Sequence, residues 1–330
     1  MKVKSNVKAG RITANHNQTT AKETQTTTKP RYSYKETLAA SQKANWRIED
    51  IIGGYKRLGF ARPLMPESFA RVGELGFLTP AEKLKLNQIR GFDYLCVFGL
   101  VEEFILPFVL DHARPQLEGD DYCTRAFLAF AAEEAKHIHL FKQFRAEFEE
   151  RFGTECLFIG PPKAIADAVL AHDPLAVALV ILHIEWMTQR HYTESVQDDQ
   201  GLDAQFKSLL KHHWMEEAQH AKLDTLMVES LAEGRGEAEL EKAMNEYLEI
   251  GGLLDGGLRQ QAEFNLENLQ RSTGRKLTED ERAEFITKQH QALRWTFLGS
   301  GMTHPNFLAT LERLSPALRR RLEQVAPLFC

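Results

Sequence analysis

The sequence of 330 residues is poor in cysteine and has no long apolar run. Its four cysteines (Cys96, Cys123, Cys156 and Cys330) are widely spaced, with no Cys-x-x-Cys pair. This excludes a disulfide scaffold and a zinc knuckle, and it favours a reducing compartment. No stretch approaches the ~18–20 apolar residues of a membrane span, and the N-terminus lacks the apolar stretch of a secretory signal. We therefore expect a cytoplasmic protein without a membrane partner.

A strong overall charge is also lacking. The net charge is −5 and the pI is about 6.2, which gives no reason to expect a nucleic-acid partner. The charge is uneven, because residues 1–36 carry eight Lys or Arg and two Glu, so this stretch is +6 and the remainder is −11. Residues 1–45 are rich in Thr, Gln, Asn and Lys and poor in apolar side chains. We expect a disordered polar arm over 1–45 and a single folded domain over 46–330.

The alternating pattern of β-strands is absent too, and helical spacing predicts an all-α protein. Residues 79–82 (Thr-Pro-Ala-Glu) have the N-cap, first-turn proline and reciprocal glutamate of a helix start. The predicted helices cover about 80–113, 121–152, 163–195, 202–232, 236–271, 279–298 and 305–325. Glycine pairs at 251–252 and 256–257 are expected to loosen or kink the fifth. The first four predict two hairpins of a ferritin-like four-helix bundle, with additional helices packed outside it.

The sequence of these four predicted helices contains an internal repeat. Residues 132–137 (Ala-Glu-Glu-Ala-Lys-His) recur 83 residues later as 215–220 (Met-Glu-Glu-Ala-Gln-His). The upstream segments 100–104 and 182–186 align at an offset of 82 and match Glu103 with Glu185, so the glutamate-to-glutamate gaps are 31 and 32 residues. A Glu and a His three residues apart lie on one helix face. At about 1.5 Å per residue, all of these side chains lie roughly 21–26 Å from their hairpin turns, at one level of the bundle.

The surroundings of the lone glutamates indicate that they point inward. Glu185 is the only formally charged residue in 174–189, and Glu102 and Glu103 are the only ones in 94–110. A buried carboxylate is costly unless it is protonated, paired or bound to a metal. Two divalent iron ions neutralise four glutamates, and mixed carboxylate and imidazole ligands suit iron or manganese. One Glu from each of two helices and Glu-x-x-His from each of the other two is the ferritin-like di-metal arrangement.

A seventh ligand is suggested by His213. At 100° per residue, His213, Glu217 and His220 fall within about 60° of one helix face. The repeat alignment selects Glu103, and Glu102 stays open as the alternative. The predicted metal ligands are Glu103, Glu134, His137, Glu185, His213, Glu217 and His220. The alternative for His213 is an ordinary packed or solvated histidine.

With these residues in this order, the chain resembles the p-aminobenzoate N-oxygenase family, a branch of the ferritin-like di-iron oxygenases. The resemblance covers about residues 85–300, and His213 carries most of its specificity, because many di-iron proteins share the rest of the pattern. It implies two iron ions, a homodimer, and O2-dependent oxidation of an aryl amine or similar small aromatic substrate. We expect an external electron donor to supply the reducing equivalents, and manganese is the alternative metal.

Other functions fit parts of the pattern. A different di-iron oxidase, such as an acyl-carrier-protein desaturase, shares the paired hairpins but has no equivalent of His213. A non-catalytic iron-storage protein is disfavoured by the length beyond four helices and by the asymmetry of the site. A helical interaction protein without metal leaves the charge of Glu185 unexplained.

Overall fold

A computed structural model describes residues 31–330, so most of the predicted N-terminal arm lies outside the described residues. Within this range the chain has no β-strand, and the prediction of an all-α fold is confirmed. The helices are α1 (Tyr34–Ala44), α2 (Glu67–Ala70), α3 (Pro80–Ala113), α4 (Asp121–Phe152), α5 (Pro162–Leu170), α6 (Pro174–Arg190), α7 (Ala204–Ala232), α8 (Glu237–Thr273), α9 (Glu279–Arg294), α10 (Ser300–Met302), α11 (Pro305–Leu314) and α12 (Pro316–Val325). Short π-helical turns follow α6 and α9.

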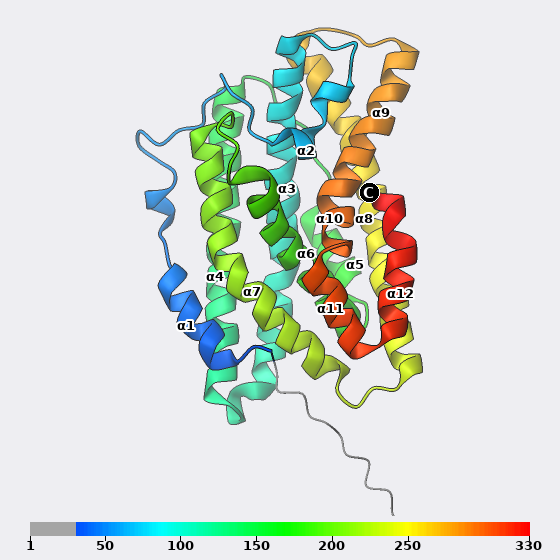
Figure 1. The fold of residues 1–330 in the computed structure, drawn as a ribbon. Helices are drawn as coiled ribbons and strands as arrows, with labels where there is room; N and C mark the ends of the chain where they lie inside the picture. Colours follow the sequence, from blue (N-terminus) through cyan, green and yellow to red (C-terminus); the bar gives the residue numbers. More distant parts are fainter. Residues whose placement is uncertain (1–30) are drawn as a thin grey trace, which may run out of the picture. The chain divides into compact units, whose positions relative to one another are not determined.

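The four-helix bundle consists of α3, α4, α6 and α7 (Figure 1). Helix α3 packs against α4, α6 packs against α7, and α4 also contacts α7. Helix α3 starts as predicted, because the Thr79 backbone N–H donates to Glu82 at 2.7 Å and the Thr79 side chain accepts from the Glu82 backbone. Helix α4 ends at Gly153, whose φ of 80° favours glycine. Local sequence therefore sets the length of the first hairpin.

Two of the predicted helices are each divided in the structure. The segment expected at 163–195 forms α5 and α6, because Asp173 caps a new helix by accepting from the Leu175 backbone at 2.8 Å. The segment expected at 305–325 forms α11 and α12, with the break at Ser315, whose backbone is extended. In both cases a proline stands at the first position of the second helix. Proline favours an extended residue before it, so it starts these helices and does not continue the previous ones.

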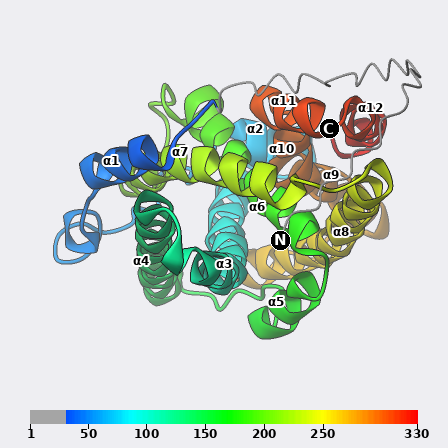
Figure 2. The ribbon, with the colours of Figure 1, turned by 90° about the horizontal axis from the view of Figure 1, so that it is seen from below.

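Helix α1 lies inside the stretch that the sequence predicts to be disordered. Ser33 caps it by accepting from the backbone N–H of Glu36 at 3.3 Å. Leu38 and Ser41 are buried, and the helix packs against α4 and α7 (Figure 2). The folded region therefore begins before the predicted boundary at residue 46. The average composition of 1–45 concealed this short buried face, which gains its stability from contact with the bundle.

The remaining helices cover one side of the bundle. Helix α8 packs against α3 and α6, and it continues through the glycine pairs at 251–252 and 256–257 without a break. Helix α9 packs against α8, where Arg294 binds both carboxylate oxygens of Asp255 at 2.6 and 2.7 Å. Figures 1 and 2 show α8 and α9 on the side of α3 away from α4.

The most apolar helix, α6, is a core element. Its residues from Leu175 to Thr188 are all buried. Across residues 31–330, no helix combines the length and the apolar composition needed to cross a lipid bilayer. The four cysteines are free thiols, and only Cys330 is exposed.

Candidate metal centre

Glutamate and histidine side chains from all four bundle helices meet in the interior. They are Glu102 from α3, Glu134 and His137 from α4, Glu185 from α6, and His213, Glu217 and His220 from α7. None of them is more than 2% exposed. Six of the seven residues predicted from the sequence are thus buried in the bundle core, on the helices to which they were assigned.

Two groups of possible ligand atoms lie side by side, and within each group the atoms are no more than 4.8 Å apart. One group contains Glu102, His137, His213 and Glu217, and the other contains Glu134, His137, Glu217 and His220. Both groups contain His137 and Glu217. The Oε1 atom of Glu217 is 2.5 Å from His213 Nε2, and its Oε2 atom is 2.7 Å from His220 Nδ1. One carboxylate therefore faces both groups, as a bridging ligand between two cations does.

The position of Glu103 differs from the prediction. Its side chain is 33% exposed and lies 3.2 Å from Lys142 Nζ, whereas Glu102 Oε1 lies 3.2 Å from His213 Nε2 inside the bundle. Consecutive helical residues point about 100° apart, so only one of this pair can face the core. The sequence did contain a signal for Glu102, because Glu102 precedes Glu134 by 32 residues, the same spacing as from Glu185 to Glu217.

Glu185 stands next to the two groups and belongs to neither. It is 2% exposed, and burial together with the neighbouring Glu217 carboxylate raises the pKa of Glu185 well above its usual range. A cation beside Glu217 would offset the repulsion between the Glu217 and Glu185 carboxylates and favour the ionised form of Glu185.

Outside the cluster, Glu216 positions His137. The Nε2 atom of His137 donates to Glu216 Oε2 at 2.9 Å, and Lys136 forms an ion pair with the same carboxylate. Trp46 stacks on the His137 ring with a centroid distance of 5.9 Å and an interplanar angle of 15°. These contacts fix the ring so that its Nδ1 atom, 3.1 Å from Glu217 Oε1, faces the cluster.

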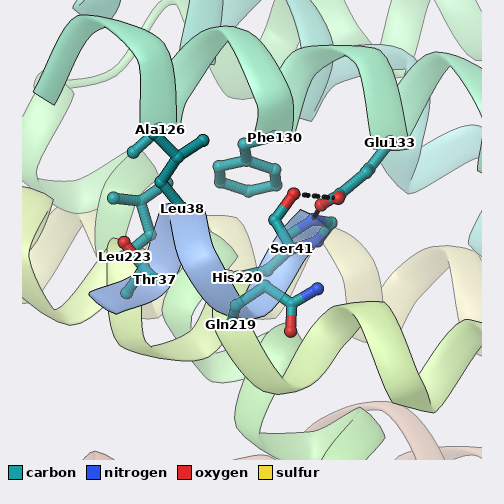
Figure 3. Close-up of a pocket in the computed structure, with 9 residues that line it drawn as sticks. All are labelled: Thr37, Leu38, Ser41, Ala126, Phe130, Glu133, Gln219, His220 and Leu223. Atoms are coloured by element: carbon teal, nitrogen blue, oxygen red, sulfur yellow. Dashed lines mark hydrogen bonds and ion pairs between the residues drawn. The ribbon is translucent and has the colours of Figure 1, made fainter. Parts of the chain in front are cut away.

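Glu133 positions His220 in the second group, as Glu216 positions His137 (Figure 3). Its Nε2 atom donates to Glu133 Oε2 at 2.7 Å, and Ser41 of α1 donates to the other oxygen of Glu133. The Nδ1 atom of His220 lies 2.9 Å from Glu134 Oε1. Metal-binding histidines typically donate their second N–H to a carboxylate, which orients the ring and raises its basicity as a ligand.

Two histidines of the cluster have raised pKa values because carboxylates surround them. Burial favours neutral His137, but the carboxylates of Glu217, Glu216 and Glu134 outweigh it and raise the pKa of His137 to about 9. In the same way, Glu217 and Glu133 hold the pKa of His220 well above its usual range against the effect of burial. Protons on imidazoles therefore balance the carboxylate charge, where metal cations would do so in a loaded site.

Several buried oxygens support cation binding. Glu102 Oε2, Glu185 Oε2 and both oxygens of Glu134 have no hydrogen-bond partner of normal geometry among residues 31–330. Such atoms are costly unless they bind something. Oxygen and imidazole donors at this density fit iron or manganese, so the residues present suit a two-metal site.

Asp224 is a buried acid near the site that the sequence analysis did not single out. It is 0% exposed, and burial raises the pKa of Asp224 well above its usual range. It stands one turn after His220 on α7, and both of its oxygens lack a partner in the described structure. Its position at i+4 from His220 was the available signal.

The sequence matches no family model and no curated protein. Among solved structures, it is similar to a variant R2-like ligand-binding oxidase with an anaerobically reconstituted Mn/Fe cofactor (TM-score 0.43, 15% identity, 81% of this chain and 93% of that chain). It is also similar to a variant with an aerobically reconstituted Fe/Fe cofactor (TM-score 0.39, 15% identity, 81% and 93%). At such low TM-scores, the metal centre rests on the residues of this chain alone.

Proposed function

We propose that this protein is a di-metal oxidoreductase that uses O2 to oxidise a small aromatic substrate, with N-oxygenation of an aryl amine as the specific reaction. The observation that carries the proposal is the shared carboxylate of Glu217, which faces two adjacent groups of buried nitrogen and oxygen ligands. Two iron ions are the proposed cofactor, with manganese as the alternative. An external electron donor and a homodimer complete the proposal.

Each group would hold one ion, with Glu217 between them. When bound, the ions supply the redox chemistry and O2 activation that amino-acid side chains cannot provide. Glu216 and Glu133 keep the Nδ1 atoms of His137 and His220 directed at the site. The burial of all these side chains excludes bulk water, which strengthens every charge interaction inside the bundle.

The asymmetry of the cluster supports N-oxygenation over the alternatives. His213 is the third histidine of the cluster and belongs to one group only, while Phe130 takes the corresponding place in the first half of the repeat, where its ring centroid lies 4.1 Å from that of His220. This third histidine is the feature on which the resemblance to the p-aminobenzoate N-oxygenases depends.

The direct test begins with iron-replete expression and metal analysis, followed by reduction and exposure to O2 in the presence of aniline-type amines. We expect two metal ions per chain, O2 consumption, and hydroxylamine, nitroso or nitro products by mass spectrometry. Less than one metal ion per chain would eliminate the di-metal proposal. A loaded, reduced protein that leaves O2 unconsumed would eliminate the oxidase proposal and favour a metal-storage protein, whose cage-sized assembly a sizing column would detect.

Variants of two neighbouring histidines on α7 test whether the reaction is N-oxygenation. The variant His213→Ala removes a donor from the cluster, whereas His212→Ala removes a half-buried ring that bonds to the Ser208 carbonyl at 2.7 Å. We expect amine oxidation to be lost in the first variant and kept in the second. Full activity in His213→Ala would instead favour another di-iron oxidase, such as a desaturase.

A further inference from the structure

A cavity of about 450 Å³ lies between α3, α5, α6 and α8. Figure 2 shows these four helices as neighbours on the side of the bundle opposite α1. The volume falls in the range of roughly 300–1,000 Å³ that is typical of small-molecule sites. Its size is therefore appropriate for an organic ligand, and it greatly exceeds the space needed for one buried water molecule.

The cavity and the metal centre lie on different sides of the same two helices. Val101 and Ile184 line the cavity, and each directly precedes a residue of the cluster region, Glu102 and Glu185. Consecutive helical residues point about 100° apart, so α3 and α6 separate the two features. None of the predicted metal ligands lines the cavity. The cavity is therefore a second feature of the fold.

The chemistry of the walls selects the kind of ligand. Valine, leucine, isoleucine and phenylalanine side chains dominate, and Gln260 is the only polar side chain among the described residues that line the cavity. None of these lining side chains is charged. Moving an ionised group from water into such a space is costly without a partner charge. The walls therefore favour a neutral ligand.

The glycines of α8 are explained by this cavity. Glycine is disfavoured in a helix interior, yet Gly252, Gly256 and Gly257 all occur within α8 and all line the cavity. Neither Gly252 nor Gly256 has a positive φ, and a Cβ atom added at either position would meet no atom within 4 Å. Backbone conformation and close packing therefore do not require glycine at these two positions. Their small size keeps this wall of the cavity open.

We propose that this cavity is a binding site for one neutral, predominantly apolar small molecule. The proposal stands on the lining residues and does not depend on the proposed metal chemistry. A matched pair of fluorescent probes tests both the site and its charge preference. N-phenyl-1-naphthylamine is neutral, and 8-anilino-1-naphthalenesulfonate has the same aromatic skeleton with an added negative charge.

The experiment titrates each probe into the full-length protein as purified, and again after removal of bound metal. We expect saturable binding of one neutral probe per chain in both preparations, with at least tenfold weaker binding of the anionic probe. No saturable binding, or equal affinity for the two probes, would overturn the proposal. Because the titration needs no metal, a lack of probe binding would not bear on the proposed oxidase activity, which is tested separately.

Two variants locate the probe. Gly256→Phe fills the cavity from α8, and Val180→Phe fills it from α6. We expect each to weaken binding of the neutral probe at least tenfold. The control, Glu263→Phe, adds the same ring at an exposed position of α8 outside the cavity and is expected to leave binding unchanged.

Thermal melting by circular dichroism and light scattering accompany the titrations. Gly256→Phe is expected to melt no lower than the original protein, because the new Cβ atom meets no neighbour and glycine is replaced in a helix. Unchanged affinity in a folded Gly256→Phe protein would place the probe elsewhere and contradict the proposal.

Discussion

His137 on α4 is hydrogen-bonded through Nε2 to Glu216 on α7, at 2.9 Å. The reverse bond also exists, because His220 on α7 donates to Glu133 on α4 at 2.7 Å. Each half of the internal repeat thus orients the histidine of the other half. The site can be complete only when α4 packs against α7, so metal affinity reports on the packing of the two hairpins.

Replacing Glu216 with glutamine is expected to weaken metal binding without destroying the site. The variant removes the charged acceptor that orients His137, and losses of such carboxylates typically cost about 10–100-fold in metal affinity. Competition with a chromogenic chelator measures the change, and the metal content at saturation should stay the same. The exposed Glu263→Gln serves as the control. An unchanged affinity in Glu216→Gln would show that the bond to His137 has no role in binding.

Glu102 and Glu103 provide a matched pair of neighbours. Glu102→Gln removes a carboxylate that faces His213, so we expect metal content to fall to about one ion per chain, because one group loses a charged ligand. Glu103→Gln removes only the half-exposed ion pair with Lys142, which is worth roughly 0–1 kcal/mol. Elemental analysis of the two purified variants shows whether Glu102 or Glu103 binds metal. Metal loss in Glu103→Gln alone would restore the assignment made from the repeat.

Metal removal is expected to lower the melting temperature. A ligand present at 1,000 times its Kd stabilises the folded state by about 4 kcal/mol. For a chain of 330 residues, this corresponds to about 6 °C in Tm. Calorimetry with and without a chelator, followed by addition of Fe(II) or Mn(II), measures the effect. Mg(II) is the control, because it prefers sites made of oxygen ligands alone and should restore little. Equal Tm values for the chelated and loaded protein would argue against the site.

The contact between α8 and α9 predicts a pH-dependent contribution to stability. Burial opposes ionisation of Asp255, but the hydrogen bond and charge of Arg294 outweigh it and lower the pKa of Asp255. A depressed carboxyl pKa adds stability above the unfolded pKa of about 3.9, and this stability is lost as the pH falls through the lower folded value. Asp255→Asn should therefore cost about 1–2 kcal/mol at neutral pH.

Urea unfolding at several pH values checks this prediction. The difference between Asp255→Asn and the original protein should shrink below about pH 4, as the original carboxyl group becomes protonated. A loss of the same size at acidic and neutral pH would mean that Asp255 acts through packing and not through its charge.

Local signals predicted the parts of the fold that one helix can specify by itself. The ends of α3 and α4 depend on Thr79, Glu82 and Gly153, which act within a turn of the chain. The division of 163–195 into α5 and α6 was missed, although Asp173 and Pro174 form a cap of the same kind. Helix α1 was missed because its buried face gains stability only against α4 and α7.

The sequence by itself determined that four helices carry two copies of Glu-x-x-His, because i and i+3 positions share a face whatever surrounds the helix. Only the tertiary structure decided that Glu102, and not Glu103, faces His213, since that depends on how far α3 is rotated about its axis. The crosswise bonds of His137 and His220, and the cavity beside α8, likewise arise where helices meet. Periodicity fixes which side chains share one helix face, but packing between helices fixes what that face meets.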